Sequence, residues 1–185
     1  MKLTLLQKIE NEINNCTRCD LYQSTICGVP GEGNSKAKIM FIGEAPGATE
    51  NKTGKPFSGR AGKLIDKGLE AIKLRRNEVF ITNIVKHRPP KNRNPLPKEI
   101  MSCKIYLENE IKLINPTLIV TLGNFATEHF IQKSKISTNH GKLIVQNGFN
   151  IYPVFHPSAA LRKKDFMESF MKDFLNIPNV LNKIK

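Results

Sequence analysis

The sequence contains no apolar run that approaches the roughly 20 residues needed to cross a lipid bilayer. Residues 1–13, MKLTLLQKIENEI, combine acidic side chains with the pattern of an amphipathic helix, which is unlike a secretory signal peptide. A membrane-spanning protein and a secreted protein are therefore not expected. We expect a soluble protein that works in the cytoplasm.

Cysteine is scarce, since the chain has only four. Because the cytosol keeps thiols reduced, four cysteines in an intracellular chain favour a metal site or free thiols over a disulfide framework. Cys16 and Cys19 form a CxxC pair, which is shared by zinc sites, redox motifs and iron–sulfur clusters. The arrangement of the cysteines is therefore more informative than their number.

Acidic residues are few relative to basic ones. The chain has 29 Lys and Arg against 16 Asp and Glu, which gives a formal net charge of +13 spread along the sequence. Such a charge indicates a polyanionic partner. A basic but inert surface, or a proteome rich in Lys, Ile and Asn, would give a similar composition, so charge alone leaves these alternatives open.

Internal repeats, low-complexity tracts and linkers are absent, and so are the glycine-rich patterns GxGxxG and GxxxxGK[ST] that bind nucleotide phosphates. A generic nucleotide-binding α/β protein is therefore excluded. At 185 residues the chain suits one domain, which we expect to span residues 1–185.

Short apolar runs alternate with helical patterns along the chain. The runs are typical of buried parallel strands and occupy 39–42, 79–85 and 117–123, with a further extended pair near 142–146 and 150–155. The helical patterns cover about 4–14, 61–72 and 100–114. This alternation predicts an α/β fold: a three-layer α/β/α single domain with a central, mainly parallel four-stranded sheet.

Three chemically distinctive segments lie at the ends of the predicted strands. GEAPG (43–47) follows the first strand, Asn83 lies late in the second, and HPSAALR (156–162) follows the last. In parallel sheets of this kind, ligands bind beyond the carboxyl ends of the strands. We therefore expect the three segments to meet at one edge of the sheet.

Four motifs occur in order: GEAPG at 43–47, GKPFSGRAG at 54–62, TNIVKHRPPKNRNP at 82–95 and HPSAALR at 156–162. Together they resemble the family 4 uracil-DNA glycosylases, the iron–sulfur branch of that superfamily. The resemblance runs from Cys16 to about Arg162. It implies a DNA-repair enzyme that flips uracil out of DNA, hydrolyses its N-glycosidic bond and leaves an abasic site for base excision repair.

An enzyme of this kind must hold the flipped base in a snug pocket and read its Watson–Crick edge. The amide of Asn83 offers a donor and an acceptor, which match uracil O4 and N3–H and mismatch cytosine. The resemblance also implies that Phe57 stacks on the uracil ring and that backbone groups at Gly43 and Ala45 complete the pocket. A capping or turn Asn and a core Phe are the structural alternatives.

Cleavage of the glycosidic bond builds positive charge on the deoxyribose and negative charge on the departing uracil. The resemblance implies that His156 hydrogen-bonds uracil O2 and stabilises this anion. It also implies that Glu44 positions or activates water and counters the charge on the sugar. The predicted catalytic residues are therefore Glu44, Asn83 and His156, with a solvated loop carboxylate as the alternative for Glu44.

Basic residues in or beside the motifs are expected to contact DNA phosphates, which fixes the register of the protein without reading sequence. By the resemblance, Leu161 is the candidate for an apolar wedge that fills the space vacated by the flipped base. SAALR could equally be the first turn of the final helix. The predicted DNA-contacting residues are Arg60, Lys63, Arg88, Lys91, Arg93, Leu161 and Arg162, with Lys163 and Lys164 beside them.

The resemblance implies a [4Fe–4S] cluster held by four cysteines, of which Cys16, Cys19 and Cys103 are matched. The fourth position holds His87, which can ligate iron as histidine does in Rieske centres. Cys27 is the competing fourth ligand, and zinc in a Cys₃His site is the competing metal. We favour His87 and iron, in a structural role that ties the N-terminal helix to the loop after the second strand.

A similar VKH arrangement occurs in the DNA-cross-linking branch of the superfamily. That branch carries a separate histidine in an inserted loop, where this chain has the short PPKNRNP. Covalent capture of DNA, an altered base preference and a non-catalytic iron–sulfur DNA-binding protein are the alternatives. His129 and His140 match no motif and are expected to be surface or packing residues. We expect a monomer that acts on uracil-containing DNA at the nucleoid.

Overall fold

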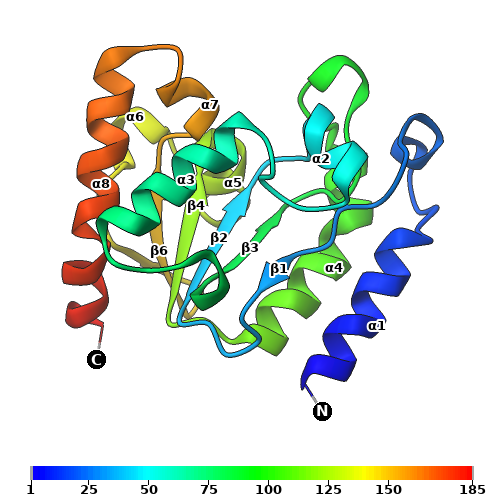
Figure 1. The fold of residues 1–185 in the computed structure, drawn as a ribbon, viewed down its shortest axis with the longest axis horizontal. Coiled ribbons are helices and arrows are strands. Elements are labelled where there is room, and N and C mark those ends of the chain that lie inside the picture. The colour runs from blue at the N-terminus through cyan, green and yellow to red at the C-terminus, as the bar shows by residue number, and fades with distance from the viewer. Residues whose placement is uncertain (1, 185) are drawn as a thin grey trace.

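The computed structural model of the protein describes residues 2–184, apart from the side chain of Leu3. Its centre is a six-stranded mixed sheet in the order β1-β3-β2-β4-β6-β5 (Figure 1). The strands are β1 (Glu32–Gly33), β2 (Ile39–Gly43), β3 (Phe80–Asn83), β4 (Leu118–Leu122), β5 (Ile144–Gln146) and β6 (Phe149–Val154). The four central strands run parallel, whereas β1 and β5 pair antiparallel at the two edges.

The predicted α/β class and parallel centre are confirmed, but the predicted count of four strands is wrong, because the sheet has six. Strand β1 has two exposed residues in a loop rich in Gly and Pro, too few to give a periodic pattern. Strand β5 has three incompletely buried residues and joins β6 through Asn147 and Gly148, which both have positive φ. An Asn-Gly pair of this kind is a strong hairpin signal.

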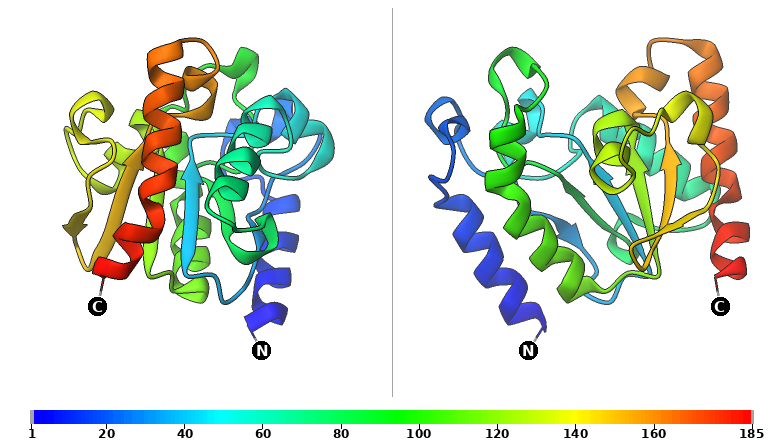
Figure 2. Two further views of the ribbon diagram at one scale, coloured as in Figure 1. Left: turned by 60° about the vertical axis from the view of Figure 1, so that its left-hand side comes forward. Right: turned by 180° about the vertical axis from the view of Figure 1, so that it is seen from behind.

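The helices cover both faces of the sheet, with α3 and α8 on one face and α4 and α5 on the other (Figures 1 and 2). The α-helices are α1 (Lys2–Asn14), α2 (Ala48–Thr53), α3 (Arg60–Ala71), α4 (Pro97–Ile114), α5 (Gly123–Phe130), α6 (Ile136–Asn139), α7 (Pro157–Ala160) and α8 (Lys164–Lys183). The 3-10 helices are η1 (Asp20–Ser24), η2 (Arg76–Glu78) and η3 (Pro90–Asn92). Among residues 2–184, no helix has the length and apolar character needed to cross a membrane.

Strand β2 lies at the centre of the sheet, and all five of its residues are buried. Phe41 faces α8, where its ring stacks on Phe174 with 5.4 Å between the centroids. Met40 and Ile42 face the opposite layer and pack in the core formed with α4. Burial on both faces explains why this strand appears in the sequence as a continuous apolar run.

The N-terminal helix α1 adds a further element outside α4, as the rear view in Figure 2 shows. Ile9, Ile13 and Cys16 pack there against Tyr106 of α4. The predicted helices at 4–14, 61–72 and 100–114 correspond to α1, α3 and α4, whose ends differ by a few residues. The sequence therefore located the three helices that flank the predicted motifs.

The C-terminal motif forms a helix of its own. Helix α7 begins with Pro157, ends at Ala160 and is separated from α8 by residues 161–163. The alternative in which SAALR is the first turn of the final helix is therefore wrong. The short helix instead directs the residues before and after it toward the carboxyl edge of the sheet (Figure 1).

The carboxyl ends of the strands bring the motif segments together, as predicted. The pairing of β2 with β3 continues beyond the strands, since the Ile84 N–H donates to Gly43 O at 2.9 Å and the Val85 N–H donates to Glu44 O at 3.2 Å. These bonds hold the start of GEAPG beside Asn83, with which Gly43 is in register. Main-chain hydrogen bonds alone therefore hold the two segments together at this edge of the sheet.

Candidate active site

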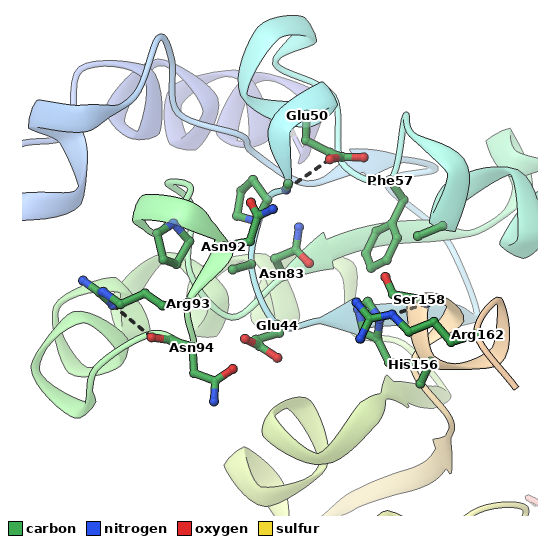
Figure 3. A pocket seen from close by; sticks show the side chains of 16 residues that line it. Glu44, Glu50, Phe57, Asn83, Asn92, Arg93, Asn94, His156, Ser158 and Arg162 are labelled. Carbon is green, nitrogen blue, oxygen red and sulfur yellow. Dashed lines mark hydrogen bonds between the residues drawn. The ribbon is translucent and has the colours of Figure 1, made fainter. Parts of the chain in front are cut away.

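A cavity of about 460 Å³ opens at this edge of the sheet (Figure 3). Its walls come from the loops after β2, β3 and β6 and from the start of α3. The lining residues are Glu44, Ala45, Pro46, Gly47, Glu50, Phe57, Ala61, Asn83, Pro89, Asn92, Arg93, Asn94, His156, Ser158, Ala159 and Arg162. Of the predicted substrate-binding set, Glu44, Ala45, Phe57, Asn83 and His156 therefore meet here.

Asn83 ends strand β3 and is 1% exposed. Its Oδ1 atom is buried and has no hydrogen-bond partner among the residues that the structure describes. Leaving a buried acceptor unsatisfied costs about 1–3 kcal/mol, so native proteins rarely do so without a reason. An N–H group of a bound molecule would satisfy this atom.

Gly43 and Phe57 form the wall beside this amide. A Cβ atom on Gly43 would lie 2.5 Å from Asn83 Oδ1 and would also meet the Phe57 ring, so a side chain at this position would collide with both. Phe57 has φ of +50°, a left-handed conformation that costs a non-glycine residue about 1–2 kcal/mol. The buried ring is therefore held beside the amide at a cost in backbone energy.

His156 caps the N-terminus of α7, and its Nδ1 atom accepts the Ser158 N–H at 3.2 Å. Because Nδ1 is the acceptor, the ring proton of the neutral form resides on Nε2. Burial, aided by the charge of Arg162, lowers the pKa of His156 to about 4. The ring is therefore neutral at physiological pH and offers one N–H donor.

Glu44 is half-buried at the floor of the same cavity, and burial raises the pKa of its carboxyl group. Within residues 2–184, no hydrogen bond occupies its carboxylate oxygens, whereas its backbone carbonyl is held by Val85. The cavity thus contains a carboxylate that is fixed by its main chain and available to a ligand or water (Figure 3).

Glu50 is a further cavity residue, which the sequence reasoning missed. Its carboxylate is buried and accepts the Gly47 N–H at 3.0 Å and the Gly59 N–H at 2.8 Å. It therefore joins the GEAPG loop to the start of α3. The signal was present as a capping box, because Glu50 stands three residues after the N-cap Gly47.

The predicted DNA-contacting residues lie at three places around the cavity. Arg60 and Lys63 are exposed in the first turn of α3, and Lys91 is exposed at the tip of the loop after β3. Leu161 is 44% exposed at the end of α7, and Arg162 beside it lines the cavity. Lys163 and Lys164 are exposed at the start of α8, and Arg88 is partly buried beside Asn92.

Arg93 differs from the other basic residues of this set because a buried carboxylate holds its guanidinium. It donates to Glu99 through both terminal nitrogens, at 2.7 and 2.9 Å, and Glu99 is 1% exposed. Glu99 also accepts the Leu96 N–H at 2.7 Å, which lowers the pKa of its carboxyl together with the Arg93 bond. Arg93 therefore anchors its loop to the start of α4 while it lines the cavity.

Three of the predicted metal ligands lie where α1 meets α4. Cys16 is buried and Cys19 half-buried after α1, and Cys103 is buried in α4. Burial is the main cause that raises the pKa of Cys103 to about 11 and that of Cys19 above its usual value, and the neighbouring cysteines add to both shifts. No group of three or more Cys, His, Asp or Glu in the described chain is arranged to hold a single metal ion.

His87 and Cys27 are the two candidates for a fourth ligand. His87 is 3% exposed, and burial lowers the pKa of its ring, which favours the neutral form that binds metals. Cys27 lies instead against α2, where its Sγ contacts Asn51 O at 3.3 Å. The Ile26 N–H beside it donates to the Asn51 side chain at 3.0 Å.

The other two histidines lie outside the cavity lining. His129 is partly buried and meets the Phe130 ring edge-on at 5.0 Å between centroids. His140 Nδ1 lies 2.9 Å from Asp173 Oδ2, and its ring packs on Phe155. Both residues make local packing contacts, as predicted.

Comparison with known proteins agrees with this geometry. A model of the uracil DNA glycosylase superfamily matches residues 30–177. The type-4 uracil-DNA glycosylase of Sulfurisphaera tokodaii is 43% identical over 93% of this chain and 83% of its own length. The type-4 uracil-DNA glycosylases of Archaeoglobus fulgidus and Thermotoga maritima are 39% and 40% identical, over 96% and 86% of this chain and 94% and 85% of their own lengths. The chain therefore belongs to the uracil-DNA glycosylase superfamily and, within it, to the type-4 uracil-DNA glycosylases.

Proposed function

We propose that this protein excises uracil from DNA by hydrolysis of the N-glycosidic bond, leaving an abasic site for base excision repair. The observation that carries this proposal is the buried, unsatisfied Oδ1 atom of Asn83 at the wall of the cavity. Uracil N3–H would satisfy this atom, and the Asn83 amide would in turn donate to uracil O4. Cytosine has an acceptor at N3 and would leave the atom unsatisfied.

Two titratable groups of the cavity, Glu44 and His156, suit the charges that develop during cleavage. Neutral His156 would donate from Nε2 to uracil O2 and stabilise the departing anion. Glu44 would orient a water molecule, accept its proton and counter the positive charge on the sugar. Phe57 would stack on the flipped base beside Gly43 and Ala45.

The basic residues around the cavity would hold the DNA backbone. Arg60, Lys63, Lys91 and Arg162 would contact phosphates, with Leu161 entering the base stack. Arg88 and Arg93 would contribute more by ordering their loop, since both donate to neighbouring side chains. We further propose that the protein acts as a monomer on uracil-containing DNA at the cytoplasmic nucleoid.

We also propose a [4Fe–4S] cluster held by Cys16, Cys19, Cys103 and His87. The donor chemistry fits, with three sulfurs and one buried neutral imidazole, and Cys103 Sγ accepts the Lys86 N–H at 3.4 Å. Hydrogen bonds to the sulfurs are a feature of iron–sulfur sites. A cluster binds each ligand at a different iron, so its ligands lie further apart than those of one zinc ion. When bound, it would cross-link α1, α4 and the loop after β3.

Loss of the Glu44 carboxylate or the His156 ring tests the assigned roles. We expect Glu44→Ala and His156→Ala to fold normally and to excise uracil about 10²–10³ times more slowly, because each removes a group that acts on charge in the transition state. The assay follows alkali-labile sites in matched oligonucleotides with U opposite G, U opposite A, unpaired U, hypoxanthine and T.

Glu128→Ala and His129→Ala are the matched controls, because both residues lie on α5 away from the cavity lining. They should retain the wild-type rate. Wild-type rates for Glu44→Ala and His156→Ala would refute the assigned roles. Tight binding of uracil-DNA without abasic product would favour the non-catalytic alternative, and a protein–DNA adduct that survives denaturation would favour covalent capture.

The pH dependence of excision follows from the two opposite pKa shifts. Burial raises the pKa of Glu44, whereas burial and Arg162 lower that of His156 to about 4. As the pH falls, Glu44 therefore becomes protonated before His156, and the rate should fall with the Glu44 titration. Single-turnover rates measured from neutral pH downward should show an acid limb in the wild type, a fall in rate as Glu44 takes up a proton, and the residual activity of Glu44→Ala should lack this limb. An unchanged limb in that variant would contradict the assignment.

Iron content distinguishes the candidate ligands. Purified wild-type protein should show visible absorbance and bound iron. Cys103→Ala and His87→Ala should lose the iron. Cys27→Ala should keep it, because the Cys27 thiol is hydrogen-bonded to Asn51 of α2. Iron and zinc are measured by elemental analysis after aerobic purification. Stoichiometric zinc in a colourless wild type would refute the cluster. Iron loss in Cys27→Ala with retention in His87→Ala would reverse the choice of fourth ligand.

A further inference from the structure

A buried ion pair lies directly behind the cavity wall. Lys86 and Glu110 have side chains that are 0% and 1% exposed, and Lys86 Nζ lies 2.7 Å from Glu110 Oε2. Burying two charges carries a large desolvation cost, and replacement of such pairs by neutral side chains of similar volume is often neutral or stabilising. Stability alone is therefore a weak explanation for this pair.

The Lys86 ammonium group has three N–H donors, and the structure uses all of them. They reach Glu110 Oε2 at 2.7 Å, Thr82 Oγ1 at 2.7 Å and the Asn83 carbonyl oxygen at 2.8 Å. The Thr82 hydroxyl also donates to Glu110 Oε2 at 2.8 Å. No ammonium proton is left over for a ligand, so the group acts on its neighbours.

Asn83 is the neighbour with a direct part in the proposed function. Its side-chain Oδ1 has no partner within the described chain, so contacts to that atom do not fix its orientation before substrate binds. Its peptide carbonyl, in contrast, is held by a charged donor at the point where β3 ends. Hydrogen bonds with an ionised donor are about twice as strong as neutral ones. The ammonium therefore fixes the backbone from which the amide projects.

The Lys86 main chain holds other parts of the structure at the same time. Its N–H donates to Cys103 Sγ at 3.4 Å, and its carbonyl accepts the Val29 N–H at 2.7 Å. Glu110 Oε1 accepts the Gly31 N–H at 2.9 Å. One residue thus contacts the base of the Asn83 amide, a proposed cluster ligand and the segment before β1.

We propose that Lys86 is a positioning residue, whose ammonium group holds the Asn83 amide in the orientation that reads the base while its main-chain N–H separately holds Cys103 Sγ. The inference rests on the proposed function, since it assigns Lys86 a part in uracil recognition. The Lys86 side chain contacts Asn83 and its main chain contacts Cys103, so a substitution of the side chain removes the first contact and leaves the second.

The test is the double variant Lys86→Met/Glu110→Gln. It removes both charges together, so no uncompensated charge is buried, and the introduced amide would keep an acceptor for the Gly31 N–H. The main-chain bond to Cys103 should persist and keep the iron content at the wild-type level. We expect single-turnover excision to slow by about 10- to 100-fold. The affinity for abasic product DNA should stay unchanged.

The matched control is Lys104→Met/Glu108→Gln, which makes the same substitutions in an exposed ion pair. Both of its residues lie on α4, the helix that carries Glu110, and Lys104 Nζ lies 3.4 Å from Glu108 Oε1. It should retain the wild-type rate. A folded Lys86→Met/Glu110→Gln variant with wild-type excision overturns the inference. A wild type without abasic product would instead refute the proposed function.

A second measurement does not depend on catalysis. In NMR spectra of ¹⁵N-labelled wild-type protein, free uracil should shift the signals of the Asn83 side-chain amide. The affinity of the double variant for free uracil should be lower than that of the wild type by about tenfold or more. Equal affinities overturn the inference. If the double variant does not fold, Thr82→Val replaces it, because valine lacks the hydroxyl that accepts from the Lys86 ammonium and donates to Glu110. Thr82→Ser is its control, because serine keeps that hydroxyl. Thr82→Val should excise more slowly than Thr82→Ser, and equal rates overturn the inference.

Discussion

The parallel pairing of β2 with β3 is the constraint on which the site depends. It places Gly43 opposite Asn83, and two further main-chain bonds carry the pairing into the loops beyond both strands. The backbone of Asn83, the wall formed by Gly43 and the backbone of Glu44 are therefore fixed by one ladder of hydrogen bonds. A shift of one residue in this register would turn Asn83 to the other face of the sheet.

Burial shifts the pKa values of two groups that lie at this edge of the sheet, Glu44 and His156. It acts in opposite senses on these two titratable groups of the cavity, raising the pKa of Glu44 and lowering that of His156. The result is a neutral N–H donor and a carboxylate with increased affinity for a proton in the same cavity. Burial is the main cause of both shifts, and the charge of Arg162 adds to the shift at His156.

Much of this was readable in the sequence, because the motifs follow buried strands whose apolar runs are unambiguous. The positions of Asn83, Glu44 and His156 at one edge follow from parallel topology alone. Strand β1 was missed because two residues give no period, whereas β5 lies in the extended segment predicted near 142–146. The role of Glu50 was missed although its spacing from Gly47 matches a capping box, and the Lys86–Glu110 pair was missed because it depends on how the loop after β3 packs on α4. The pairing of Arg93 with Glu99 likewise depends on how its loop meets α4.

In the proposed function, the Asn83 amide reads uracil through its N3–H. Single-turnover excision of uracil and of 3-methyluracil from otherwise identical oligonucleotides tests this role, because the methyl group removes that N–H. We expect 3-methyluracil to be excised more slowly by a factor on the order of 10⁴, since Asn83 Oδ1 would stay buried without a donor. Comparable rates for the two bases would refute the role assigned to Asn83.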